Sequence, residues 1–490
     1  MVAAADMYRL ALLIAVSSVG ARGLMPEMGE KMNNAEAALR KRVGWLPDTF
    51  DTRDANFGCG ATILDQARAL DMRVASARPS SSDPFLVASC PQAQCGSCWA
   101  VSAASMLSDR YCIHSGQFSA GGHAQVMLSP QHLVSCASMS NSAPVLPYES
   151  MGCNGGYQAD AFRFLSENGT ATMVAEHAGC APYLSTSCSP DPDGDGCVSC
   201  ALARACLDTG EAPPHVFSVA ASGVIEAQHG LPTRAIQTEI LANGPVHACF
   251  DVYTNFFDFF SAWPTRVYNS TDGAEFAGGH CVKIIGWGTA DEGMPFWLIA
   301  NSWGTEWAQQ GVFRYARGLD LGGIDSSVWA ACPSDTKCTL TAAVKTDATP
   351  SMGRRSGGMW HPVQASHSHV ARALQAAKRH VAAWARRSQG DEAVRTVHAR
   401  LMQTLASEPA VQCAYTQIVN GLNVKVVLSS AAAPDHLQEL PLVITTHMAP
   451  SSDGEHTLLR VQEGTGDVCP ANRAVAAAAI QTPSQDVNHP

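Results

Sequence analysis

The sequence predicts an α+β protein of at least two domains, and three observations support this. The chain has 490 residues, which is longer than a single hydrophobic core usually accommodates. Of these residues 46% are hydrophobic, which is ample for packed cores. The apolar run Val101 to Leu107 indicates a buried helix, whereas Val282 to Trp287 and Phe296 to Ala300 are bounded by Gly and Pro, as strands are. The composition changes after residue 335. We therefore expect a large mixed domain followed by a smaller one.

Charge and hydropathy exclude two classes of protein. The chain carries 32 Lys and Arg against 43 Asp and Glu, a formal charge of −11. It lacks the basic surface that neutralises nucleic-acid phosphates, so we expect no nucleic-acid partner. No apolar run reaches about 18 residues, so we expect no membrane span.

The N-terminus has the pattern of a secretory signal peptide over residues 1–21. An apolar stretch, Leu10 to Val19, leads into small residues around Ala21. The alternative is a short buried helix. Entry into the secretory pathway implies an oxidising environment in which most of the 18 cysteines form disulfides. We expect a lysosome- or vacuole-like compartment or the extracellular space.

Shifts in composition divide the rest of the chain. We expect a short pro-segment at 22–45, a main folded domain at 46–335, a linker at 336–368, a second domain at 369–470 and a disordered tail at 471–490.

Three residues have the chemistry of nucleophilic catalysis. Cys98 opens the predicted helix, where the positive end of the backbone dipole lowers a thiol pKa. His280 follows two glycines and precedes an apolar strand, which would hold an imidazole rigidly as the base. Asn301 lies at the end of another strand and can accept a hydrogen bond from that ring. We expect these three side chains to meet.

Two further residues complete this candidate site. Gln92, with the backbone N–H of Cys98, would form a two-donor hole for a tetrahedral oxyanion; Gln94 is the alternative donor. Trp303 would shield the hydrogen bond between His280 and Asn301.

These residues lie in motifs that resemble the papain-like cysteine proteases, and the wider pattern resembles their cathepsin B branch. The resemblance covers roughly residues 46–335. The motifs are Cys95 to Trp99, Ser108 to His114, Leu133 to Cys136, Gly152 to Tyr157, Asn243 to Val246, Gly278 to Gly288 and Phe296 to Gly304. The resemblance implies a two-lobed fold, with a helical lobe and a twisted antiparallel sheet lobe. It also implies peptide or protein substrates, no cofactor, no metal, and the family's catalytic roles for Cys98, His280, Asn301 and Gln92.

The same resemblance suggests the residues that bind substrate. Gly155 and Gly156 match the backbone ladder for an extended substrate, and Gly279 lets the substrate backbone approach. Tyr157 and Asp325 match positions that line the pocket for the second residue before the scissile bond. Asp325 there would accept Arg or Lys. Its alternative is a solvated surface acid.

The resemblance also implies five disulfides, which are Cys95–Cys153, Cys59–Cys112, Cys136–Cys200, Cys180–Cys206 and Cys188–Cys197. Cys98 must remain a free thiol. Seven cysteines have no assigned partner, namely Cys90, Cys249, Cys281, Cys332, Cys338, Cys413 and Cys469.

The chain departs from the cathepsin B pattern in a loop that normally carries paired histidines. Here residues Ser189 to Cys197 form an acidic loop, which would repel a substrate's terminal carboxylate. We therefore expect endopeptidase rather than exopeptidase activity. The loop resembles the start of a calcium site, but Leu202 stands where a bidentate Glu is needed, so we expect a solvated turn. The pro-segment is also short, so something else is expected to restrain the enzyme.

The second domain resembles a cystatin, an inhibitor of papain-like enzymes. An amphipathic helix is predicted from Val370 to Trp384, and two β-prone runs meet at Asn420-Gly421. This hairpin carries Gln417, Val419 and Gly421 in the Q-x-V-x-G pattern of the cystatin inhibitory loop. An unrelated helix-and-hairpin domain and a weakly ordered extension remain as alternatives.

The sequence thus predicts a cysteine endopeptidase that hydrolyses peptide bonds through a Cys98 acyl-enzyme. Its own cystatin-like domain, or separate cystatin-type inhibitors, would be its partner. The alternative is an inactive protease-like binding protein whose extension inhibits other cysteine proteases. All four catalytic positions are filled, which favours the enzyme.

Overall fold

The computed structural model describes residues 46–55, 95–115, 126–137, 148–173, 216–227, 229–346, 355–384, 392–406, 410–429, 441–450 and 454–463, with the single residues 59, 64, 181, 183, 200 and 469. The predicted signal peptide, pro-segment, tail and acidic loop lie outside these residues. So do Gln92, Gln94 and Cys90. No helix in the described segments is both long and apolar enough to cross a membrane.

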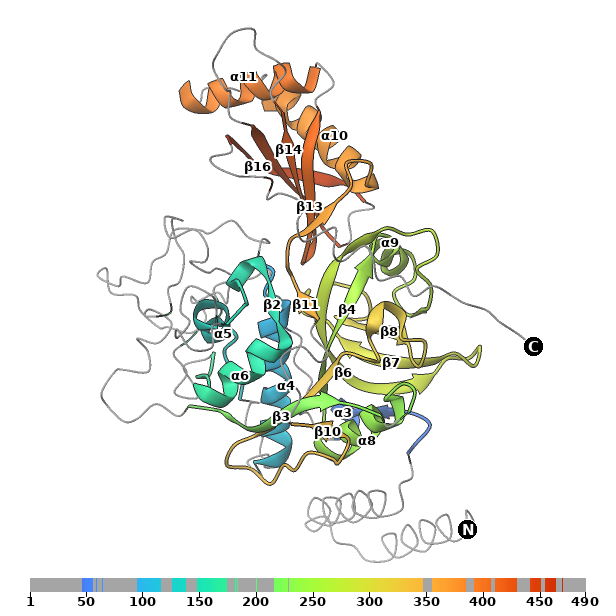
Figure 1. Cartoon of the computed structure of the whole chain (residues 1–490). Coiled ribbons are helices and arrows are strands. Elements are labelled where there is room, and N and C mark those ends of the chain that lie inside the picture. Colours follow the sequence, from blue (N-terminus) through green and yellow to red (C-terminus); the bar gives the residue numbers. More distant parts are fainter. Residues whose placement is uncertain are drawn as a thin grey trace, which may run out of the picture.

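The large unit has two lobes (Figure 1). The helical lobe contains α4 (Cys98–His114), α5 (Gln131–Cys136), the 3₁₀ turn η2 (Gly152–Asn154) and α6 (Gln158–Glu167). The sheet lobe carries the remaining helical elements of this unit, which are α3 (Thr52–Ala55), α8 (Thr233–Asn243), α9 (Asn255–Ala262) and η4 (Leu321–Gly323). A helical lobe beside a sheet lobe agrees with the predicted papain-like α+β fold.

The sheet lobe is built on nine described strands in the order β10-β3-β9-β4-β6-β7-β8-β5, with β1 paired to β6. All of these pairs are antiparallel except β5 with β8. The strands are β1 (Phe50–Asp51), β3 (Val219–Ile225), β4 (Val246–Tyr253), β5 (Val267–Tyr268), β6 (Phe276–Thr289), β7 (Pro295–Ala300), β8 (Val312–Ala316), β9 (Val328–Pro333) and β10 (Val344–Lys345). The long central strand β6 is almost wholly buried, which explains its continuous apolar sequence.

The helix α4 is buried between the lobes over most of its length. Small and apolar residues surround its axis, as expected of a helix covered on several sides. Two buried ion pairs fix its position: Arg110 pairs with Glu239 of α8 at 2.9 Å, and Asp109 pairs with Lys283 of β6. Because a buried charge that loses its partner is costly, these pairs tie the register of α4 to that of β6.

Residues 336–368, expected to be a linker, contain three short strands. The Cys332–Cys338 disulfide and β10 belong to the large unit. The strand β11 (Ser356–Gly357) pairs with β2 (Gly156–Tyr157) of the helical lobe, and β12 (His361–Val363) joins the C-terminal sheet. The stretch therefore contributes structure to both units.

The C-terminal unit is a five-stranded antiparallel sheet in the order β12-β13-β14-β15-β16, with two helices. Its other elements are α10 (Ser368–Trp384), α11 (Glu392–Ala406), β13 (Val411–Val419), β14 (Gly421–Leu428), β15 (Leu442–Met448) and β16 (His456–Glu463). The amphipathic helix predicted from Val370 is α10, and the hairpin predicted at Asn420-Gly421 is β13–β14.

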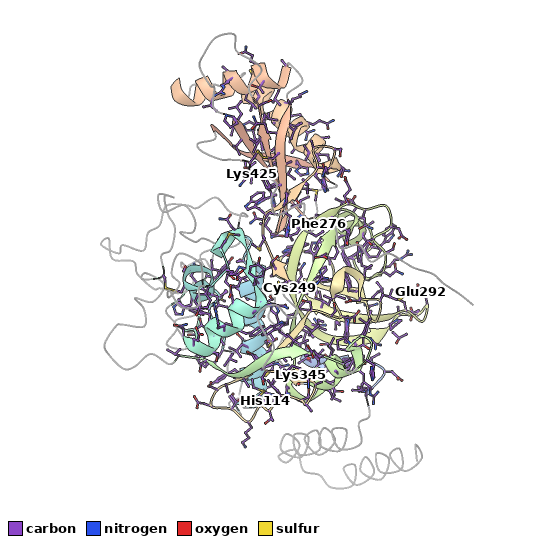
Figure 2. The ribbon with its side chains drawn as sticks, viewed as in Figure 1. His114, Cys249, Phe276, Glu292, Lys345 and Lys425 are labelled. Atoms are coloured by element: carbon purple, nitrogen blue, oxygen red, sulfur yellow. A yellow bond between two sulfur atoms is a disulfide. The ribbon has the colours of Figure 1, made fainter. Side chains whose placement is uncertain are left out.

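Aromatic contacts pack this unit onto the large one, near the tip of the β13–β14 hairpin. Figure 2 labels Phe276 on the large unit and Lys425 on the small one. The ring of Phe276 contacts the ring of His361 edge to face, and the Lys425 ammonium lies 4.3 Å from the ring centre of Trp360. The segment between β11 and β12 is thus held from both sides.

Candidate active site

Cys98 is the first residue of α4 and is wholly buried. Among the described cysteines it is the one free thiol. Burial raises the pKa of Cys98 to about 12, although backbone N–H groups, first that of Cys281, act in the opposite direction. A thiol at this helix end would be acidic in water, so its high pKa here is the effect of a covered site.

His280 lies in β6, and its ring is oriented by Asn301. The Nε2 atom of His280 lies 2.8 Å from Asn301 Oδ1. A carbonyl oxygen only accepts, so Nε2 carries the proton and donates it. The other nitrogen, Nδ1, is then the basic one, and it is buried without a hydrogen-bond partner within the described segments. The ring is therefore held in the tautomer that can take a proton from a thiol.

Aromatic rings fix the imidazole from both sides. Trp303 stacks on His280 with ring centres 4.9 Å apart, and Phe250 of β4 contacts it edge to face at 5.9 Å. Burial lowers the pKa of His280 to about 4, against a smaller opposing effect of the bond to Asn301. Trp303 thus covers one face of the His280 ring.

The backbone of β6 brings the two halves of the site together. The N–H of Cys281, the residue after His280, points to the Cys98 thiol. Lys283, on the same strand, pairs with Asp109 of α4. Cys98 on α4 thus lies against the residue that follows His280 on β6, and Asn301, just after β7, bonds the His280 ring; all three side chains are buried.

The predicted substrate ladder is occupied by the chain itself. Residues Ser356 and Gly357 pair antiparallel with Tyr157 and Gly156. The next residue, Gly358, donates its N–H to the carbonyl of Gly279 at 2.9 Å. Gly155, also predicted to bind substrate, lies against the backbone of Gly358 and Met359.

Gly357 lies directly against the Cys98 thiol. A Cβ atom added to Gly357 would lie 2.6 Å from Cys98 Sγ and 2.5 Å from Cys281 Sγ. Only a glycine fits at this point, because real Cβ atoms do not approach other heavy atoms so closely. The contact explains why Cys98 is fully buried.

The predicted inhibitory loop lies beside this segment. The side-chain amide of Gln417 donates to the carbonyls of Gly358 at 2.8 Å and Cys153 at 3.0 Å. Ile418, next to it, approaches Gly278. Val419 and Gly421 pair with each other at the end of the β13–β14 hairpin. Gln417 therefore bridges the extension and the helical lobe.

Asp325 does not have the free carboxylate expected of a pocket for Arg or Lys, nor is it a surface acid. It is buried, and its oxygens accept from the indole N–H of Trp297 and from the backbone N–H groups of Gly318 and Asp320. Its carboxylate is thus used to hold the turn around η4. Asp251 on β4, by contrast, does contact a basic side chain, because its carboxylate lies 2.6 Å from the Arg355 guanidinium.

Three of the five disulfides implied by the family resemblance are present, namely Cys59–Cys112, Cys95–Cys153 and Cys136–Cys200. Cys180, Cys188, Cys197 and Cys206 lie outside the described residues. Three further disulfides join cysteines that had no assigned partner, namely Cys249–Cys281, Cys332–Cys338 and Cys413–Cys469. No sequence signal indicates the Cys249–Cys281 pairing, because it depends on the register between β4 and β6.

Comparison with known proteins agrees with this geometry. A family model described as papain family cysteine protease matches residues 83–332. A gut-specific cysteine proteinase of Caenorhabditis elegans is 40% identical over 247 residues, covering 49% of this chain and 66% of the relative. Cathepsin B-like cysteine proteinase 5 of the same species is 37% identical over 257 residues, covering 49% and 68%. The chain thus spans about two thirds of the length of these relatives.

Among solved structures, proCathepsin B S9 from Trypanosoma congolense is 28% identical and covers 59% of this chain and 78% of its own, with a TM-score of 0.42. The matched segment contains Cys98, His280 and Asn301, and it covers half of the chain. On its sequence and on its buried thiol and oriented imidazole, the chain belongs to the papain family of cysteine proteases.

Proposed function

We propose that the protein is a cysteine endopeptidase restrained by its own C-terminal unit. The observation that carries the peptidase proposal is the His280 tautomer: Asn301 holds the proton on Nε2 and leaves Nδ1 as the base for the Cys98 thiol. Cys98 would attack the peptide carbonyl, His280 would protonate the leaving amine, and water would then hydrolyse the thioester. No cofactor is needed for these steps.

The second part of the proposal is that residues 355–359 act as an internal substrate mimic. The segment adds to the β2 ladder, donates from Gly358 to Gly279, and covers the thiol with Gly357. These are main-chain contacts of the kind by which an extended peptide is recognised regardless of its side chains. An external substrate cannot occupy the same ladder while this segment is bound.

The sheet and helix of the C-terminal unit support a cystatin-like identity for it. Its helix α10 and its hairpin with Gln417, Val419 and Gly421 fit the predicted pattern. A second contact comes from the β15–β16 end, where Ser261 of α9 donates to the carbonyl of Pro450 at 3.2 Å. One segment and two hairpins thus touch the peptidase, although residues 440–460 contain no Pro-Trp pair like that of a cystatin's second hairpin.

The restrained state also lacks the reactive form of the site. With the cleft covered, burial places the pKa of Cys98 at about 12 and that of His280 at about 4. Both groups are therefore neutral at pH 7, and the thiolate needed for attack is absent. Release of the segment would return water to the cleft and remove the cause of both shifts.

The geometry of residues 355–359 also explains how this segment would resist cleavage by Cys98. The carbonyl of Gly358 accepts from Gln417, a side chain of the same extension, and Gly358 has a positive φ of 69°. This carbonyl is thus oriented by the hairpin, whereas a substrate carbonyl must turn toward the donors of an oxyanion hole.

Preference for endopeptidase over exopeptidase action rests on the acidic loop at 189–197 and stays a prediction.

The test is hydrolysis of a dipeptidyl-arginine fluorogenic substrate by three proteins. These are the full chain, a chain ending at Thr346, which keeps β10 and the Cys332–Cys338 disulfide, and the full chain with Cys98→Ala. We expect slow hydrolysis by the full chain, fast hydrolysis by the shortened one and none by the variant. Equal rates for the first two would reject the restraint.

A second arm separates the enzyme from a binding protein. A folded but inactive shortened chain would reject the peptidase proposal. If the isolated C-terminal unit then inhibited papain tightly, the alternative of a protease-like inhibitor would replace it.

A further inference from the structure

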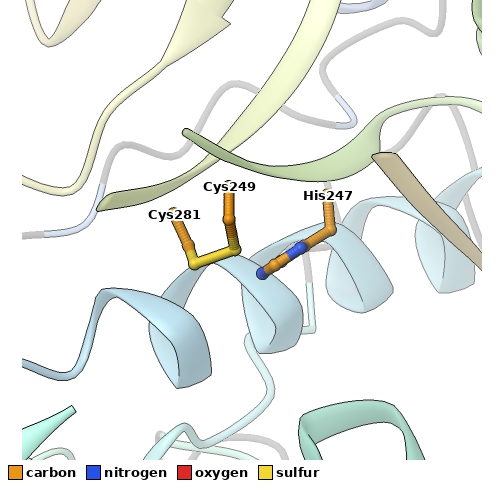
Figure 3. Close-up of side chains that lie close together, drawn as sticks. All are labelled: His247, Cys249 and Cys281. Atoms are coloured by element: carbon orange, nitrogen blue, oxygen red, sulfur yellow. A yellow bond between two sulfur atoms is a disulfide. The ribbon is translucent and has the colours of Figure 1, made fainter. Parts of the chain in front are cut away.

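Three residues with metal-binding side chains meet in the interior, beside the catalytic site. His247 and Cys249 lie two apart on β4, so their side chains share one face of the sheet. Cys281 is the direct partner of Cys249 on the neighbouring strand β6. Figure 3 shows the imidazole of His247 beside the disulfide that joins the two cysteines. Their donor atoms lie within 4.8 Å of one another.

His247 is an unusual residue for this position. It is wholly buried, and neither of its ring nitrogens has a hydrogen-bond partner within the described segments. Buried polar groups are normally paired, because leaving them unpaired costs free energy. Within the described segments the ring can therefore serve as a ligand without breaking a hydrogen bond.

We propose that His247, Cys249 and Cys281 form a zinc site when the Cys249–Cys281 disulfide is reduced. A dithiol reductant supplies two electrons and two protons to the S–S bond, becomes a cyclic disulfide, and leaves two thiols. Zinc then binds and displaces both thiol protons.

The donor set and its charge suit zinc better than a hard cation. Two thiolates and an imidazole are zinc ligands, whereas calcium and magnesium prefer oxygen. Two thiolates also balance the charge of Zn²⁺, which a buried site requires. Two donors bound to one zinc ion at about 2.0–2.3 Å are at most about 4.6 Å apart. The present donor atoms lie within 4.8 Å of one another, so small side-chain shifts would bring all three onto one ion.

The site would reach the catalytic thiol. Cys281 Sγ and Cys98 Sγ lie 2.5 and 2.6 Å from the same point beside Gly357, so the two sulfurs are no farther apart than the sum of these distances. A zinc ion bound to Cys281 therefore has Cys98, the one free thiol of the described cysteines, within reach for the fourth position. Zinc bound at this site would ligate Cys98 and so block the nucleophile. Peptidase activity would then depend on zinc once the Cys249–Cys281 disulfide is reduced.

The site is tested on the full chain with Co²⁺, whose thiolate charge-transfer band reports sulfur ligation without any assay of activity. The chain is treated anaerobically with dithiothreitol, and alkylation followed by mass spectrometry identifies the opened disulfide. Circular dichroism checks that the fold persists. We expect one Co²⁺ per reduced chain, displaced by Zn²⁺, and none per oxidised chain.

Variants locate the metal. His247→Phe keeps the ring shape and should weaken Co²⁺ binding more than about tenfold. Cys98→Ala should retain binding through the other three ligands. The matched control is Cys332→Ala with Cys338→Ala, which removes a different disulfide of the same domain and should leave binding unchanged.

Three results would overturn the proposal. The first is a folded, reduced chain that binds no stoichiometric Co²⁺. The second is binding lost with Cys98→Ala but kept with His247→Phe, which would place the metal on the catalytic pair. The third is a chain that unfolds whenever the Cys249–Cys281 bond is opened, because the site needs the β4–β6 register. None of these depends on whether the C-terminal unit restrains the peptidase.

Discussion

Substitution of Gly357 by alanine should activate the full-length protein. The added methyl would lie 2.5 Å from Cys281 Sγ and 2.6 Å from Cys98 Sγ. Neither sulfur can retreat, because Cys281 is held in a disulfide within β6 and Cys98 begins the buried helix α4. Overpacking of this kind costs about 1–3 kcal/mol. At about 1.4 kcal/mol per tenfold, the population with an open cleft should rise about 5- to 150-fold.

The assay is the initial rate of hydrolysis of the dipeptidyl-arginine substrate, with the number of reactive thiols measured in parallel by alkylation. The substitution lies outside the catalytic residues, so each opened molecule should turn over at the normal rate. Ser356→Ala is the matched control, because it places a methyl side chain at the neighbouring position of β11 without adding an atom. If Gly357→Ala and Ser356→Ala hydrolysed substrate at the same rate, the idea that Gly357 seals the thiol would be wrong.

Three further changes test other parts of the structure. Gln417→Ala removes donors to two carbonyls and, at about 1 kcal/mol for each hydrogen bond, should raise the full chain's rate up to tens of fold, again measured by substrate hydrolysis. Acidification should destabilise the C-terminal unit, because burial lowers the pKa of His369 to about 3 and of His456 to about 4. The unfolded rings take up a proton below about pH 6.5, whereas the folded rings stay neutral until about pH 4. The free energy of unfolding should therefore fall as the pH drops below 6.5, by on the order of 2 kcal/mol per ring at pH 5. A melting temperature independent of pH between 6.5 and 4 would contradict this. Lys283→Met removes the ammonium that pairs with the buried Asp109, so denaturant titration should show a loss of about 3–5 kcal/mol in unfolding free energy.

The catalytic elements were predictable because their signals are local. The apolar residues after Cys98 are contiguous in sequence, and the strand after His280 is bounded by glycine on both sides. Chain position alone therefore indicated which residue begins a helix and which lies in a strand. The hairpin at Asn420-Gly421 is local in the same way, because the turn residues and both strands are adjacent.

The features that the sequence did not reveal depend on contacts between distant segments. Cys249 pairs with Cys281 only because β4 and β6 align in one particular register. The carboxylate of Asp325 is enclosed by Trp297 and a tight turn, which composition cannot show. The occupied ladder depends on Gly357 reaching Gly156 across some two hundred residues of chain.

Gln92 lies outside the described residues, so its oxyanion role stays a prediction from the family resemblance.

The covalent connection between β10 and β11 has a consequence for how such an enzyme behaves in a cell. The peptidase sheet ends at Lys345 and the segment beside Cys98 begins at Ser356, so in the proposed restrained state the covering segment and the enzyme are always present one to one. An inhibitor on a short tether acts at an effective concentration in the millimolar range, whatever the amount of protein. Diluting the protein would therefore not release the proposed restraint. A single proteolytic cut between Lys345 and Ser356 would allow the covering segment to dissociate. Activity would then depend on the concentration of the protein, because the released unit would have to bind again from solution.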